Sequence, residues 1–201
     1  MTIGSTSLRR RPLVAALLLG ASLGAALPAQ AATVAYEVGP ASEISYMVVH
    51  PMHQVHASSH ALTGRLGVAD GKLVLPATLR LPLLSFDSGN GSRDSNAATT
   101  LNVGRFPLTT LEVESFAESA RLKEGTLTRI AGTATGKLTL HGVTRPVSIP
   151  LTATLSAATL AVDATFSVSL TDYQIPRPSL LFRPIDDDVK LTVHLVAAPA
   201  R

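Results

Sequence analysis

Residues 145–155 read RPVSIPLTATL, and apolar and polar side chains alternate along the whole of this stretch. The same alternation recurs over residues 72–83, 159–170 and 189–195. Successive side chains of a β-strand point to opposite faces, so each stretch predicts a strand with one apolar face and one face in water. The fold should therefore consist of long strands that bury one face each.

Weaker alternation predicts further strands over residues 42–49, 58–68, 108–116 and 126–140. Turn signals separate several of the strands, at Asp70-Gly71, at His141-Gly142 and at 156–158. The total is about eight antiparallel strands. Four prolines fall among the polar positions, and each removes a hydrogen-bond donor, which predicts that they lie at sheet edges, bulges or barrel corners. They are Pro76, Pro82, Pro146 and Pro150.

The helical signal is short, because Ser92 could cap a single helix over Arg93–Leu101. Many long strands and almost no helix leave two all-β architectures, a two-sheet sandwich and a closed barrel. Aromatic residues are few, with three Tyr, five Phe and no Trp, and this favours the barrel. A barrel of about eight strands has an interior that is filled by side chains or by one small ligand.

The beginning of the chain has the features of a secretory signal peptide. Arg9, Arg10 and Arg11 precede an apolar run over 13–27, and Ala29-Gln30-Ala31 fits the cleavage rule of small residues. We therefore expect cleavage after Ala31, which divides the chain into a signal peptide, 1–31, and a barrel domain, 32–201. The sequence leaves open whether export uses the general secretory or the twin-arginine pathway.

Composition excludes several classes of function. The leader carries three of the 17 Lys and Arg residues and no acidic residue, so the rest of the chain has 14 basic and 14 acidic residues. A net charge of zero argues against a nucleic-acid partner. The absence of cysteine excludes disulfides, thiolate metal sites and a cysteine nucleophile. No serine-hydrolase, zinc-protease or phosphate-loop motif is present, so we expect a protein that is not an enzyme.

Four histidines lie close together in the sequence, at His50, His53, His56 and His60. Imidazole is a common ligand of zinc and copper, which raises an alternative function, that of an exported stress-response or metal-handling protein using the His50–His60 hairpin. On a strand, however, His56 and His60 would lie about 13 Å apart, too far to share one ion. We therefore favour a hairpin with solvated histidines and expect no bound metal.

Four groups of residues resemble the YceI-like family of exported lipid-binding proteins. The most specific is GKLTLHGVTRPV at 136–147, in which a strand, an HGVT turn and a returning strand follow one another. The others are SYMVVH at 45–50 with TGRL at 63–66, SFDSGN at 85–90 with Arg93-Asp94 and RFP at 105–107, and FSVSLTDY at 166–173 with Asp188-Val189. Together the four groups extend from about Tyr36 to Leu195.

The resemblance implies an all-β fold, an extended antiparallel eight-stranded lipocalin-like barrel with a short capping helix, and a periplasmic location. It also implies a ligand, a polyisoprenoid such as a polyprenol or an isoprenoid quinone, held inside the barrel for transport or storage. Two features depart from the family. Asn96 stands where the family often has His, and the closing segment at 173–182 is longer than the usual Asp-Phe-Gly-Ile type.

The candidate lipid-binding residues lie on the predicted inward faces of the strands. They are Tyr46, Val48, Leu79, Leu81, Ile149, Leu151, Val162, Phe166, Val168, Leu191 and Val193. The sequence leaves open whether the protein touches a membrane transiently during lipid exchange, and whether it forms a homodimer.

Overall fold

The alternating stretch at 145–155 lies in strand β8 (Val143–Leu155), whose odd-numbered side chains are the buried or half-buried ones from Val147 to Ala153. The computed structural model describes residues 32–50, 53–180 and 183–200. The predicted signal peptide lies outside these residues and stays a prediction. No helix in the described part of the chain has the length and apolar character needed to cross a membrane.

Strands make up most of the described chain. The long strands of the wall are β4 (Thr63–Ala69), β5 (Lys72–Pro82), β6 (Leu108–Glu124), β7 (Leu127–Leu140), β8, β9 (Leu160–Ser169) and β12 (Asp188–Pro199). The remaining strands are β1 (Val34–Val38), β2 (Glu43–His50), β3 (His53–Ser59), β10 (Ser179–Leu180) and β11 (Arg183–Pro184). A 3-10 turn, η1 (Leu83–Ser85), and one helix, α1 (Gly91–Thr100), connect β5 to β6.

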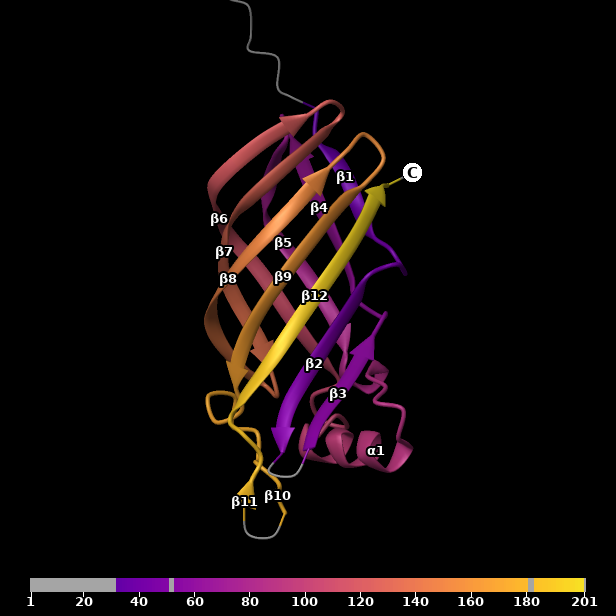
Figure 1. Cartoon of the computed structure of the whole chain (residues 1–201), viewed down its shortest axis with the longest axis vertical. Helices are drawn as coiled ribbons and strands as arrows, with labels where there is room; N and C mark the ends of the chain where they lie inside the picture. Colours follow the sequence, from indigo (N-terminus) through magenta and orange to yellow (C-terminus); the bar gives the residue numbers. More distant parts are fainter. Residues whose placement is uncertain (1–31, 51–52, 181–182, 201) are drawn as a thin grey trace, which may run out of the picture. The chain divides into compact units, whose positions relative to one another are not determined.

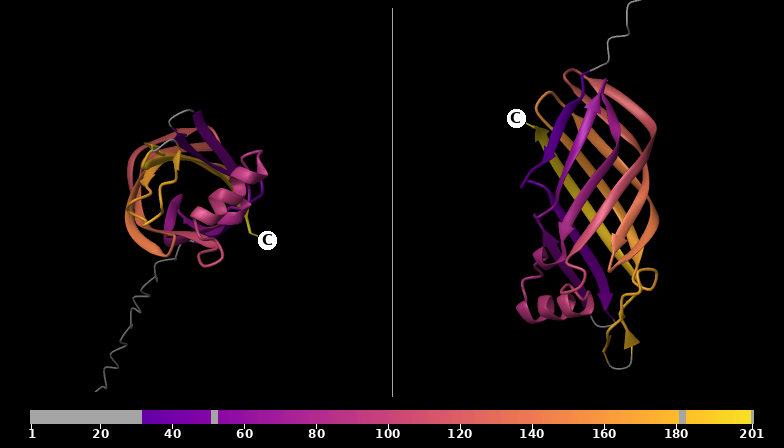
Figure 2. Two further views of the ribbon diagram at one scale, coloured as in Figure 1. Left: turned by 90° about the horizontal axis from the view of Figure 1, so that it is seen from below. Right: turned by 180° about the vertical axis from the view of Figure 1, so that it is seen from behind.

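Eight of the strands form the closed antiparallel barrel that the sequence predicts. Their order around the wall is β1-β4-β5-β6-β7-β8-β9-β12, and β1 pairs with β12 to close the ring. Figure 1 shows the barrel from the side, and Figure 2 shows it from below and from behind. Its apolar core has two parts, one around Leu66, Leu81 and Leu195 and the other around Leu138 and Tyr173.

The hairpin of β2 and β3 joins the wall beside β12. Residues 190–194 of β12 pair with β2, whereas residues 197–199 pair with β1. Strands β1 and β2 therefore take successive places along one edge of β12. This arrangement brings β2 into the wall at the end of the barrel that carries α1 (Figure 1).

The predicted strand over 58–68 is wrong as a single element. Its part from Thr63 onward lies in β4, but the chain leaves β3 after Ser59 and is not in a strand between the two. Side chains hold the break between them. Ser59 Oγ accepts a hydrogen bond from the Ala61 amide at 3.1 Å, and His60 Nδ1 lies 2.8 Å from the carbonyl oxygen of Ser42. The local bond from Ala61 to Ser59 gives the backbone an alternative to the sheet ladder.

Two other boundaries differ from the prediction. Strand β6 continues well beyond residue 116, and its last residues, 117–124, are exposed on both faces, so no alternation marks them. The helix begins at Gly91 rather than Arg93, because Asn90 caps it: the Asn90 side chain accepts a hydrogen bond from the Arg93 amide at 3.1 Å. Strand β1 was not predicted at all, since five residues are too few to show a period.

The predicted turns are present where the chain needs a left-handed backbone. Asp70 and Gly71 have φ values of 51° and 70°, and His141 and Gly142 have 52° and 76°. Two consecutive residues of this kind are the signature of a tight hairpin. Only glycine fits at 142, because a Cβ there would lie 2.4 Å from the Phe106 ring.

Three of the four predicted prolines lie where backbone pairing is interrupted, whereas Pro82, the last residue of β5, pairs with Leu108. Pro76 faces the irregularity in β4 between Arg65 and Gly67. Pro146 and Pro150 lie in the part of β8 that does not pair with β9, since that pairing begins at Leu151.

Candidate functional site

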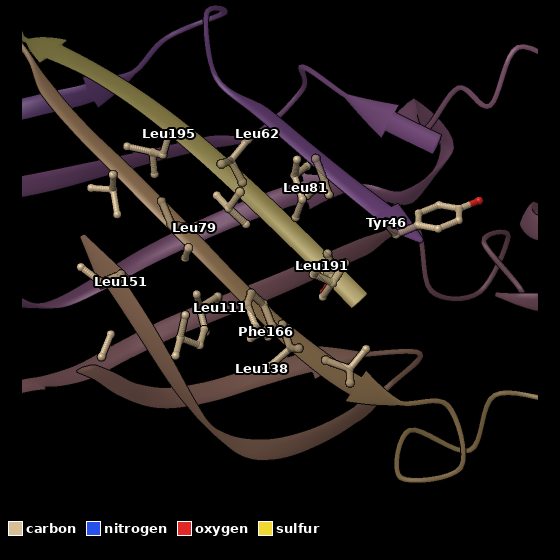
Figure 3. A pocket seen from close by; sticks show the side chains of 18 of the residues that line it. Tyr46, Leu62, Leu79, Leu81, Leu111, Leu138, Leu151, Phe166, Leu191 and Leu195 are labelled. Carbon is tan, nitrogen blue, oxygen red and sulfur yellow. The ribbon is translucent and has the colours of Figure 1, made fainter. Parts of the chain in front are cut away.

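The barrel encloses a cavity of about 1060 Å³, which runs from the end that carries α1 toward the hairpin turns at the other end. Pockets that bind small molecules usually measure about 300–1,000 Å³. The cavity is therefore as large as a site for a sizeable organic ligand. Figure 3 shows its lining of leucine and phenylalanine side chains.

Each of the predicted lipid-binding residues contributes to the lining of this cavity. Figure 3 labels six of them, Tyr46, Leu79, Leu81, Leu151, Phe166 and Leu191. The placement follows from the period of two, since the inward parity of β5, β8, β9 and β12 was readable from the sequence. That these residues contact a lipid stays a prediction.

Many lining residues were missed, including all the apolar ones that β6 and the middle of β7 contribute. These apolar residues are Leu111, Val113, Phe116, Ile130, Ala134 and Leu138. The inward positions of β7 include Gly132 and Gly136, which leave little apolar signal in the sequence. At Gly132 the missing side chain has a structural role, because a Cβ there would lie 2.5 Å from the Phe116 ring.

The middle of the cavity is apolar and its two ends are polar. At the end near α1 the lining includes the Tyr46 phenol and six other polar side chains. They are His53, Arg80, Arg93, Asn96, Thr100 and Thr109. The opposite end carries Lys72, Glu118 and Arg121. Between these groups, the lining side chains of the described residues are hydrocarbon. Such a site suits a long apolar chain with a polar terminus.

Several large inward side chains in the middle of the wall are only half-buried, although they face away from bulk water. Leu79, Leu151, Phe166 and Leu191 all have this intermediate exposure. Protein interiors are normally packed to the density of organic crystals, and a residue at the centre of a filled barrel would be buried completely. The interior of this barrel is therefore hollow.

Tyr46 lies at the end of the cavity nearest α1, and Figure 3 shows its hydroxyl directed away from the leucines. Its ring packs edge-on against Phe86, with 5.0 Å between the ring centroids. Burial raises the pKa of the Tyr46 phenol, the negative charge of Asp94 adds to the rise, and Arg93 opposes it. The phenol is therefore a neutral hydrogen-bond donor at physiological pH.

Helix α1 is anchored by residues of the SFDSGN and Arg-Asp groups. Asp94 accepts hydrogen bonds from the amide and the hydroxyl of Ser88, and Arg93 donates to the carbonyl and the hydroxyl of the same residue. A backbone bridge between Ser58 and Asp87 ties the loop to β3. These contacts place α1 at the end of the cavity.

The HGVT turn supports the segment that follows β9. His141 Nδ1 lies 3.1 Å from the carbonyl oxygen of Tyr173, and the His141 ring packs edge-on against Phe106. Arg145 donates a hydrogen bond to the carbonyl of Asp172. Asp187 accepts hydrogen bonds from Ser169 and Thr171, which lower the pKa of its carboxyl. The turn and these carboxylate contacts therefore hold the chain between β9 and β12 against the barrel.

The histidine segment forms the β2–β3 hairpin, with His53 opposite His50 and His56 opposite Met47. The side chains of His53, His56 and His60 are exposed, and His53 also borders the cavity. Within residues 32–50, 53–180 and 183–200, no three His, Asp or Glu side chains are grouped so that they could hold a metal ion. The turn at 51–52 and the His50 side chain lie outside what is described, and the absence of metal stays a prediction.

A family model described as YceI-like domain matches residues 36–197. Among solved structures, BcnA of Burkholderia cenocepacia gives a TM-score of 0.66 at 20% identity and covers 80% of this chain and 99% of that chain. A polyisoprenoid binding domain from Saccharophagus degradans, implicated in plant cell wall breakdown, gives 0.60 at 17% identity, with coverages of 83% and 99%. A YceI protein of Campylobacter jejuni gives 0.59 at 12% identity, with coverages of 73% and 86%.

These structural similarities establish a common fold. Comparison of the sequence with curated proteins gave no match.

Proposed function

Because the chain belongs to the YceI-like family, we propose that it is a periplasmic lipid-binding protein that holds one isoprenoid lipid, a polyprenol or a quinone, inside its barrel. The observation that carries the proposal is the cavity of about 1060 Å³, with its hydrocarbon middle and polar ends. One of the structurally similar proteins is a polyisoprenoid binding domain. We infer a binding role rather than catalysis, since the proposal requires no reacting group.

The tail of the lipid should supply most of the affinity relative to water. Each methylene group removed from water contributes about 0.8 kcal/mol. A single hydrogen bond to a headgroup contributes about 1 kcal/mol net. A tail of many carbons that lies along Leu79, Leu151 and Leu191 therefore outweighs any one polar contact at the ends.

Relative to a membrane the balance is different. Moving the tail from a bilayer into the barrel exchanges one apolar environment for another, so the apolar contribution to transfer is close to zero. Loading and release should therefore be reversible, as a carrier requires. We propose transient contact with a membrane as the source of the lipid, and export by the predicted leader as the route to the periplasm.

The described residues supply no observation that favours the metal-handling alternative, because they group no set of metal ligands. A test separates the two functions directly. Protein exported by its native host is extracted with organic solvent, and the extract is analysed by mass spectrometry while the protein is analysed for metal. We expect about one prenyl lipid per chain; extracts without prenyl lipid would contradict the proposal.

Two neighbouring positions on β8 provide a matched pair of variants. Leu151 lines the cavity, whereas Thr152 is exposed on the outer face. Leu151→Trp should lower the lipid content of purified protein about tenfold, because the larger side chain occupies the space of the tail. Thr152→Trp adds the same bulk outside and should retain the lipid. Thermal unfolding of both variants verifies that each is folded.

A further inference from the structure

The wall of the barrel has an incomplete seam between β5 and β6. Backbone pairing between these strands runs from Pro82 opposite Leu108 to Ala77 opposite Val113, and it ends there. Beyond that point β5 pairs with β4, and β6 pairs with β7 as far as Glu124. Residues 72–76 and 114–124 therefore form two facing edges that no sheet ladder joins. We call this region, together with Gly71 in the turn just before the first edge, the β5–β6 seam.

Local sequence explains why the ladder stops. Pro76 has no amide hydrogen to donate at the place where the pairing would continue. Strand β6 is irregular between Val113 and Ser115, and again between Glu118 and Ala120. Bulges bend a strand and increase its twist, and both irregularities lie where β6 no longer pairs with β5.

The cavity extends to both edges of the seam. Leu73 and Leu75 of β5 and Phe116 of β6 line it there, followed by Glu118 and Arg121 at the rim. The side chains of Glu118 and Arg121 are 35% and 33% exposed. These residues border the cavity and contact solvent at once, so the cavity meets the outside at the seam.

Among the described residues, one side chain carries the hydrogen bond that joins the two edges. Arg121 Nη2 donates to the carbonyl oxygen of Gly71 at 3.1 Å, and Arg121 Nε donates to Glu118 at 2.9 Å. Lys72 adds a charge attraction to Glu118 from the opposite edge. Such contacts at a half-exposed site are weak and are readily exchanged for water.

A second interruption, between β8 and β9, is closed by packing. Residues 143–150 of β8 have no partner on β9, but their inward neighbours are tightly buried: Ile149 is 4% exposed and Val168 is 7% exposed. Leu170, Tyr173 and Ile175 pack into the same cluster as Val168. Opening this interruption would expose fully buried side chains. The β5–β6 seam is bordered instead by the half-buried Leu73, Leu75 and Phe116, and polar contacts at the surface join its edges.

We propose that the β5–β6 seam is a lateral portal through which the chain of an isoprenoid lipid enters and leaves the cavity, with Arg121 as its latch. Val74 and Leu122 lie on the outer face of the two edges, and they are 40% and 56% exposed. They therefore offer apolar contact to a lipid tail that passes through the portal. The identity of the ligand rests on the proposed function, whereas the existence of the portal depends only on the structure of the barrel wall.

The first test measures exchange of retinol, a fluorescent isoprenoid alcohol, by stopped flow. Arg121→Ala should raise both the association and the dissociation rate about fivefold, which corresponds to the loss of one weak hydrogen bond. Arg129→Ala is the matched control, because Arg129 pairs with Glu124 within the β6–β7 hairpin and does not reach across the seam. Retinol that binds with equal rates in all three proteins would overturn the proposal.

The second test cross-links the two edges of the seam. Because the chain has no cysteine of its own, a thiol reagent reacts only with the introduced cysteines. The pair Lys72→Cys and Glu118→Cys is joined by a reductant-cleavable bifunctional thiol reagent. The control pair, Thr78→Cys and Glu112→Cys, replaces register partners in the paired part of the same strands. Joining the first pair should slow retinol exchange about tenfold, reversibly on reduction, and joining the control pair should not. Exchange that stays fast in the locked protein would overturn the proposal.

A third measurement needs no bound lipid and therefore separates the portal from the proposed function. Ala134 lines the cavity and is 5% exposed, so Ala134→Cys places a single thiol inside the barrel. N-ethylmaleimide should label this thiol several-fold faster when Arg121→Ala is added, and at an unchanged rate with Arg129→Ala. Faster labelling supports the portal even if retinol does not bind, which would contradict the proposed function alone; unchanged labelling overturns the portal.

Discussion

At the scale of the residue, the two faces of one strand make the sharpest contrast. Val168 of β9 is 7% exposed and lines the cavity, whereas its neighbour Ser167 is exposed and lies opposite Lys190. Val168→Asp places a carboxylate among apolar side chains and should lower the free energy of unfolding by about 3 kcal/mol or more. Ser167→Asp adds the same group to a wet face beside a lysine and should change it by about 0.5 kcal/mol or less. Urea unfolding of both variants measures this difference, and equal tolerance would contradict the assigned faces.

Individual residues also show the limit of what the sequence predicts. The lining residues of β8 and β9, such as Leu151 and Phe166, follow from strict alternation. Phe116 and Arg121 do not, because the irregularities within β6 change which side chains face inward. No local pattern encodes such a shift, since it depends on which neighbouring residue each strand pairs with. The Arg121 contact to Gly71 joins residues fifty positions apart and was invisible for the same reason.

At the scale of the element, the link between β9 and β12 depends on Asp187. Its carboxylate accepts hydrogen bonds from the hydroxyls of Ser169 and Thr171. These bonds, that of Ser169 most strongly, hold the pKa of Asp187 below its ordinary value. A carboxyl whose pKa is lowered by folding stabilises the protein fully above its unfolded pKa, and the contribution is lost as the pH falls through the folded pKa. Asp187→Asn should therefore lower the Tm by a few degrees at neutral pH, and the difference from the native protein should vanish in acid, well below about pH 4.

Asp186→Asn is the control for this link, since Asp186 is the adjacent carboxylate and its exposed side chain makes none of the Asp187 contacts. Scanning calorimetry across the pH range provides the measurement. A difference between Asp187→Asn and the native protein that persists unchanged in acid would show that the carboxylate bonds do not stabilise the link.

Elements differed in how far the sequence predicted them. Strands β5, β8, β9 and β12 alternate strictly and were placed within a few residues of their true ends. Strand β7 was found, but glycines at its inward positions hid its share of the lining. The predicted strand at 58–68 ran across the break between β3 and β4 because Leu62, within the break, is itself buried and extends the apolar pattern.

At the scale of the whole molecule, export and folding meet at the predicted cleavage site. Cleavage after Ala31 would leave Ala32 as the first residue, immediately before strand β1 begins at Val34. The mature chain would therefore keep β1, the strand that closes the ring against β12, and with it every strand of the barrel. Intact-mass measurement of protein exported by its native host should give the mass of residues 32–201. A membrane-bound species that retains residues 1–31 would contradict this expectation.

The hollow interior predicts that the stability of the whole barrel depends on its ligand. An empty cavity of about 1060 Å³ leaves the lining side chains without contacts that a bound tail would supply. A ligand that binds the folded state alone stabilises it by mass action, by about 2.7 kcal/mol when its free concentration is a hundred times Kd. The Tm of delipidated protein should therefore rise with added retinol, and Thr152→Trp should behave in the same way. Leu151→Trp should show a smaller rise, because its side chain already occupies part of the space. A Tm of the native protein that is independent of retinol would mean that the cavity does not accept an isoprenoid chain.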